Sequence, residues 1–127
     1  MKTGFLLLFL LTSGLKGFSQ STVHKNAVDV FLLRYNENNF NGIYESFSTK
    51  MREAHTKEYY LSFFSRVKQE YGRLTLLELL QYKETASHKT RGEYNGNFES
   101  GNLTVRISTD SENRIIGLYF LKGDIFL

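Results

Sequence analysis

The hydrophobic positions that follow the first twenty residues repeat with the spacing of helices. Apolar residues recur every three to four positions in three stretches, 23–37, 40–53 and 56–71. This spacing places them on one side of a helix, where they pack against a core. An Asn-rich break between the first two stretches is predicted to form caps and a turn, with ligand contact as the alternative; it contains Asn36, Asn38, Asn39 and Asn41. The pattern predicts three consecutive helices.

The second half of the chain alternates in character with the period of two that is typical of strands. In the stretch 88–99, one face is predicted to be packed and consists of His88, Thr90, Gly92, Tyr94, Gly96 and Phe98. Three further strands are predicted, over 74–80, 103–108 and 115–121. The order of elements predicts an α+β fold in which three N-terminal helices pack on a curved four-stranded antiparallel sheet.

The first and last predicted strands carry apolar residues on both faces. The first run contains Leu74, Leu76, Leu77, Leu79 and Leu80, and the last contains Ile115, Ile116, Leu118, Tyr119 and Phe120. An uncovered apolar face usually marks an interface. A second copy of the chain is the simplest expected cover, with curvature of the monomer or the tail over 123–127 as alternatives.

The first nineteen residues have the pattern of a secretory signal peptide. Lys2 precedes an apolar run over 4–11, and Gly17 and Ser19 are the small residues that a signal peptidase prefers. The run is shorter than the roughly 18 apolar residues that cross a bilayer. We expect cleavage after Ser19, a single mature domain over 20–127, and a secreted or periplasmic protein with no membrane attachment after cleavage.

Charge and cysteine content exclude further classes. The whole chain has 16 Lys and Arg against 13 Asp and Glu. The predicted signal peptide contains Lys2 and Lys16, so the mature chain has 14 basic and 13 acidic residues, a net charge of +1. A nucleic-acid binder needs a denser positive field, so no nucleic-acid partner is expected. Because there is no cysteine, the stability of the exported domain must come from its core.

Catalytic and metal-binding motifs are missing from the sequence. His24, His55 and His88 fall on different predicted elements, so they do not form the cluster that a metal site needs. There is no Gly-x-Ser-x-Gly or Ser-x-x-Lys motif and no cysteine nucleophile. We therefore expect no cofactor, no metal and no residue that can be assigned a catalytic role.

Several short motifs resemble those of a known family. They are Phe31-Leu32-Leu33-Arg34-Tyr35-Asn36, Phe40-Asn41-Gly42-Ile43-Tyr44, Phe47-Ser48, Met51, Phe63-Phe64, Tyr71-Gly72, Tyr94, Phe98-Glu99-Ser100-Gly101, Ser108, Asp110 and Ile115-Ile116-Gly117-Leu118. With this order of elements, the mature chain resembles the bacterial domain of unknown function 3887 (DUF3887) and, more broadly, the cone-shaped nuclear transport factor 2-like superfamily. The resemblance implies a fold but no catalytic residues. Members that precede a serine-hydrolase domain imply an accessory role as one alternative.

The residues predicted to face the inside of the cone are the candidate ligand pocket. They are Phe31, Tyr35, Tyr44, Phe47, Phe64, Tyr94, Phe98 and Glu78. The tyrosines equally fit a packed core in which each hydroxyl is hydrogen-bonded. Glu78 stands out because an acid in an otherwise apolar strand is costly to bury unless it is paired or protonated. The alternative is that Glu78 faces water.

Two classes of function fit these expectations. The first is an exported, non-catalytic binding or interaction domain that takes an apolar small molecule in the cone and forms a homodimer, or binds another exported protein, through its sheet face. The second is a small cofactor-free isomerase or cyclase-like enzyme that uses a tyrosine and an acid, Asp29 or Glu78, inside the cavity. An accessory domain for a separate serine hydrolase is a third possibility that follows from the family resemblance alone.

Overall fold

The structure of the chain is a computed structural model that describes residues 21–122, 125 and 126. Its helices are α2 (Thr22–Asn36), α3 (Phe40–Glu45), α4 (Thr49–Ala54) and α5 (Lys57–Tyr71). Its strands are β1 (Leu74–Glu84), β2 (Thr90–Phe98), β3 (Gly101–Thr109), β4 (Ile115–Lys122) and the two-residue β5 (Ile125–Phe126). The predicted α+β class is confirmed. The predicted signal peptide, residues 1–19, lies outside the described residues.

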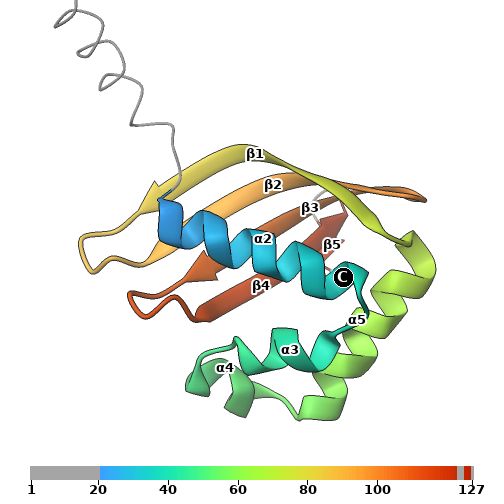
Figure 1. Cartoon of the computed structure of the whole chain (residues 1–127), viewed down its shortest axis with the longest axis horizontal. Helices are drawn as coiled ribbons and strands as arrows, with labels where there is room; N and C mark the ends of the chain where they lie inside the picture. Colours follow the sequence, from blue (N-terminus) through green and yellow to red (C-terminus); the bar gives the residue numbers. More distant parts are fainter. Residues whose placement is uncertain (1–20, 123–124, 127) are drawn as a thin grey trace, which may run out of the picture.

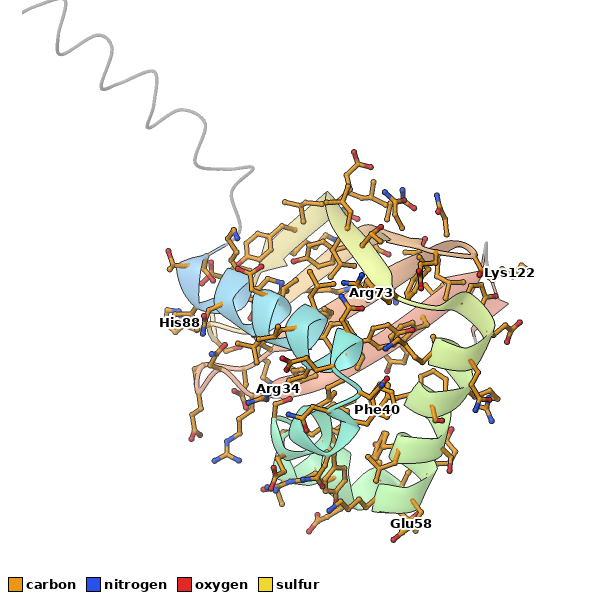
Figure 2. The ribbon with its side chains drawn as sticks, turned by 45° about the vertical axis from the view of Figure 1, so that its right-hand side comes forward. Arg34, Phe40, Glu58, Arg73, His88 and Lys122 are labelled. Carbon is orange, nitrogen blue, oxygen red and sulfur yellow. The ribbon has the colours of Figure 1, made fainter. Side chains whose placement is uncertain are left out.

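The helices cover one face of an antiparallel sheet (Figure 1). The strands follow the chain in the order β1-β2-β3-β4-β5, so each strand pairs with its neighbour in sequence. β1 and β2 arch over α2, while α3 and α4 lie beside β4 (Figure 1). Side chains fill the space between the helices and the sheet (Figure 2). This interior is one core that includes Phe31 of α2, Phe64 of α5 and Val105 of β3.

Two short helices, α3 and α4, stand where the sequence pattern predicts one helix over 40–53. The prediction of three helices is therefore wrong, and the described residues contain four. The chain breaks between α3 and α4 because it pairs there with the start of β4: Ile115 N–H donates to Ser46 C=O, and Ser48 N–H donates to Ile115 C=O, each at 2.9 Å. Phe47 between them is fully buried. The apolar spacing continues through the break and hides it from a periodicity argument.

The alternation predicted for 88–99 is confirmed from Thr90 onward. Thr90, Gly92, Tyr94, Gly96 and Phe98 are buried, and the residues between them are more exposed. His88 is the exception, because it lies in the β1–β2 turn with a φ of 63°. That turn is closed by Thr85 N–H, which donates to Lys89 C=O at 2.8 Å. The strand therefore starts two residues later than predicted.

The outer strands leave apolar side chains exposed in the single chain. On β1, Leu77 and Leu79 pack against the core, whereas Leu76 and Leu80 are 51% and 60% exposed. On β4, Phe120 is buried and Tyr119 is 45% exposed. The described residues do not cover this second face, so self-association through the sheet stays a prediction.

The Asn-rich segment has the structural role that the sequence favours. The Asn39 side chain caps α3 by accepting from Gly42 N–H at 3.0 Å. The Asn36 amide pairs with both backbone groups of Leu74: it donates to the C=O at 2.8 Å and accepts from the N–H at 2.9 Å. Asn36 thereby ties the end of α2 to the start of β1.

Candidate functional site

The predicted inner residues form a packed core. Six of the eight candidates are buried, and they are Phe31, Tyr35, Phe47, Phe64, Tyr94 and Phe98. Their rings contact one another, as in the Tyr35–Phe98 pair, whose ring centroids are 5.8 Å apart at an interplanar angle of 80°. Tyr44 is half-buried beside Phe47. The rings fill the space that the cone interpretation assigns to a ligand, and Phe47 and Phe64 also line the pocket described next.

The two acids predicted to point inward do not do so. Asp29 is on the exposed side of α2, where its carboxylate forms a 3.0 Å ion pair with Lys25. Glu78 is exposed on β1 and pairs in register with Asn95, so it lies on the sheet face away from the helices. Between them, Leu77 and Leu79 take the inward positions of the strand. Facing water, the alternative weighed for Glu78, is therefore correct.

A pocket of about 840 Å³ opens between α4, the first half of α5 and β4. We call it the α4–α5–β4 pocket. Its apolar lining includes Phe47, Met51, Phe63, Phe64, Leu118 and Phe120. Its polar and charged lining includes Ser48, Lys50, His55, Tyr59, Tyr60, Lys89, Asp110 and Tyr119. This volume, and this mixture of apolar and polar side chains, fit a small-molecule site.

Direct contacts between α4, α5 and β4 hold the walls of the pocket in place. The Tyr60 hydroxyl donates to Met51 C=O at 2.6 Å and so links α5 to α4. Phe63 packs edge to face on Phe120, with ring centroids 5.7 Å apart, which links α5 to β4. Tyr60 also packs edge to face on Phe47 at 4.9 Å. The described residues make these contacts among themselves, so the pocket is formed before any ligand enters.

Aromatic residues with polar groups line the pocket near the start of α5. His55 and Tyr59 stack at 4.0 Å with an interplanar angle of 17°, and Tyr60 meets the His55 ring edge on at 5.7 Å. Burial raises the pKa of Tyr60, and the nearby tyrosines, Tyr59 first, raise it further. The Tyr60 hydroxyl therefore stays protonated at neutral pH, and its proton is directed to the Met51 carbonyl.

A second polar cluster is buried under α2, away from the pocket. The His24 ring is fully buried. Its Nδ1 lies 2.6 Å from Thr90 Oγ1 and its Nε2 lies 2.9 Å from the Tyr94 hydroxyl. Thr90 is in turn hydrogen-bonded to Thr109. A Cβ added at Gly92 would lie 2.7 Å from His24 Nε2 and 2.6 Å from the Tyr94 oxygen, so only glycine leaves room for this hydrogen bond.

Burial keeps this cluster uncharged at neutral pH. It lowers the pKa of His24 from 6.5 to about 4, and it raises the pKa of Tyr94. The sequence pattern predicts His24 on a separate helix and contains no spacing that connects it with β2. The alternation of Thr90 and Tyr94 on the packed face was the available signal, but it does not tell which helix residue lies above them. Because the cluster is buried from solvent, its role is structural: it holds α2 against the sheet.

Neither a metal site nor a membrane span is found in the described part of the chain. Over residues 21–122, 125 and 126, no three His, Cys, Asp or Glu side chains group as metal ligands would. Over the same residues, no helix combines the length and the apolar character needed to cross a membrane.

Comparison with known proteins identifies a family but no activity. The family model described as "Protein of unknown function (DUF3887)" matches residues 29–118, which contain α4, α5 and the first half of β4. This match confirms the DUF3887 resemblance drawn from the sequence motifs. No curated protein and no solved structure matches the chain.

Proposed function

The chain belongs to the DUF3887 family, and from that premise we propose that it is a binding domain whose α4–α5–β4 pocket takes an apolar small molecule. One observation carries the proposal: the pocket is large enough for such a ligand, is lined mainly by rings and aliphatic side chains, and is fixed by contacts within the chain. A preformed apolar pocket binds without paying to order its own walls.

Binding is better supported than proton-transfer catalysis. The isomerase or cyclase alternative needs a free tyrosine and an inward acid in one cavity. The Tyr35 hydroxyl instead donates to Gly72 C=O at 2.9 Å, and the Tyr94 hydroxyl is bonded to His24. In the pocket, the one carboxylate of the lining is Asp110, and it already accepts backbone N–H groups.

The proposal also includes export, the nuclear transport factor 2-like cone and self-association. The signal-peptide pattern of residues 1–19 supports export. Helices on the inner side of an arched antiparallel sheet support the cone. Exposed Leu76 and Leu80 support contact with a second copy. Native mass spectrometry of the exported protein tests two of these points: a chain that starts at Gln20 and a dimeric mass are expected, and a retained Met1 or a monomer would contradict them.

Nile red, an uncharged apolar dye, tests the pocket itself. We expect its fluorescence to rise on binding the purified protein and to show saturation. Ala54→Trp places an indole among the pocket-lining residues and should weaken binding. Ser62→Trp adds the same group at an exposed position of α5 outside the lining and should leave binding unchanged. Thermal melts of both variants show that they fold. No saturable binding, or equal binding by the two variants, would overturn the proposal.

A further inference from the structure

We propose that the ligand of the α4–α5–β4 pocket is an amphipathic oxyanion, with a flat apolar body among the rings and a carboxylate or phosphate at the hairpin end of the pocket. This inference rests on the proposed function, because it names the ligand class of the same site. It follows from where the charged lining residues stand along the sheet, and from the balance of charge among them.

The charged residues of the lining gather at one end of the sheet. Lys89 directly precedes Thr90, Asp110 directly follows Thr109, and Thr90 and Thr109 are register partners. Thr109 also pairs with Ile115, whose carbonyl accepts from Ser48 N–H. Ser48 is the N-cap of α4, and Lys50 lies in the first turn of that helix. All three charges therefore lie near this Thr90–Thr109–Ile115 row.

Three rings of the lining, those of Phe63, Phe64 and Phe120, lie toward the other end, whereas Phe47 bridges to Ile115 in the charged row. Phe120 is five residues beyond Ile115 on β4, which at 3.3 Å per residue places it about 16 Å along the strand. Phe63 packs on Phe120 from α5, and Phe64 lines the same region. The pocket thus has a charged end beside the β1–β2 and β3–β4 turns and a more apolar end where Phe63 of α5 meets Phe120 of β4. Figure 1 shows both turns at the end of the sheet opposite α5. A ligand that satisfies both ends is amphipathic.

The balance of charge at the polar end favours an anion. Lys50 and Lys89 contribute two ammonium groups, and Asp110 contributes one carboxylate. Asp110 Oδ1 is already engaged, since it accepts from Glu112 N–H at 3.0 Å and from Arg114 N–H at 2.9 Å. Neither lysine forms an ion pair within the described residues. An incoming oxyanion would supply the partner that these exposed ammonium groups lack.

A planar series of probes separates the charge from the apolar body. We would measure the binding of 2-naphthoate, 2-naphthamide and 2-naphthamidine by displacement of Nile red. The three molecules share one ring system and have similar shapes, but they are anionic, neutral and cationic. We expect 2-naphthoate to bind about tenfold more tightly than the amide, as two partly exposed ion pairs would give. The amidine should bind most weakly. Added salt should weaken the binding of 2-naphthoate and leave that of the amide nearly unchanged.

Variants at the polar end assign the preference to its residues. Lys50→Gln with Lys89→Gln should remove most of the tenfold preference and leave 2-naphthamide affinity unchanged. The matched control is Lys83→Gln with Lys122→Gln, which removes two exposed lysines outside the lining. Asp110→Asn keeps an oxygen that can accept the two N–H bonds but removes the negative charge, so it should tighten 2-naphthoate binding about threefold. Opposite effects from the lysine and aspartate variants are hard to obtain from misfolding.

The outcomes separate this inference from the function on which it rests. Equal affinity for acid and amide, or tighter binding of the amidine, would overturn the oxyanion while leaving an apolar pocket. If the probes and Nile red all fail to bind, the proposed function itself fails. 2-Naphthyl phosphate is compared with 2-naphthoate in the same assay. Tighter binding of either one than of the amide supports the oxyanion, and whichever of the two binds more tightly indicates whether the natural ligand carries a phosphate or a carboxylate.

Discussion

Acidification is expected to destabilise the folded chain through His24. The ring lies fully buried between Thr90 and Tyr94, and burial lowers its pKa from 6.5 to about 4. As the pH falls through 6.5, the ring takes up a proton in the unfolded chain but stays neutral in the folded chain. The unfolded state then binds more protons, so the free energy of unfolding falls with the pH. The loss is complete about one pH unit below the folded-state pKa, where the ring is protonated in both states.

The interval between the two pKa values sets the size of the effect. Each pH unit of that interval corresponds to about 1.4 kcal/mol. The interval from 6.5 to about 4 therefore removes about 3 kcal/mol from the free energy of unfolding. Domains of this kind have roughly 5–15 kcal/mol in total, so the loss is a large part of it. Above about pH 7.5 the ring is neutral in both states and His24 contributes no slope.

Urea unfolding followed by circular dichroism measures this slope, at about pH 7.5, 6.5, 5.5 and 4.5. His24→Gln removes the titrating ring. Subtracting the free energy of unfolding of the variant from that of the wild type then removes the contribution of the carboxylates, which both proteins share. This difference in the free energy of unfolding, wild type minus His24→Gln, should fall by about 3 kcal/mol between pH 7.5 and 4.5. His55→Gln and His88→Asn, at exposed positions, are controls that keep the wild-type slope. Parallel pH curves for wild type and His24→Gln would refute the reasoning.

Three further substitutions test how the fold is held together. Gly92→Ala should cost about 2 kcal/mol in thermal unfolding, because the new methyl group collides with the His24–Tyr94 hydrogen bond. Gly117→Ala, whose nearest contact is 3.5 Å away, is its control, and equal losses would contradict the crowding argument. Asn36→Ala should cost about 2 kcal/mol in urea unfolding, because both backbone groups of Leu74 lose their partner; the exposed Asn41→Ala should cost far less. Ser48→Ala removes the N-cap of α4 and should cost about 1 kcal/mol in the same assay, whereas an unchanged midpoint would count against the cap.

Local patterns predict the elements of this fold better than they predict its surfaces. The alternation through Thr90 and Phe98 reflects a strand packed on one face, and the structure has that strand. The interruption at Phe47 was invisible for a physical reason. It is caused by hydrogen bonds to Ile115, nearly seventy residues later, while Phe47 itself remains buried. Partners that lie so far apart in the chain leave no periodic signal.

Hydrophobic patterns do not distinguish a core from a cavity wall. Phe31, Tyr35 and Phe98 were correctly predicted to face inward, yet they pack ring against ring. The open pocket lies instead where α4 and α5 meet β4, and it depends on the break that the pattern missed. His55, Tyr59 and Lys89 belong to it through tertiary structure alone. No spacing in the sequence connects them.

Every strand of the sheet pairs with its neighbour in sequence, which affects the order in which the chain folds. Each of its ladders can close as a local hairpin, so little loop entropy opposes the growth of the sheet. The docking of α2 is different, since His24 meets residues 66 and 70 positions further along the chain. The rate-limiting step of folding should therefore be the packing of α2 against the completed sheet. α2 is also the first helix of the described chain.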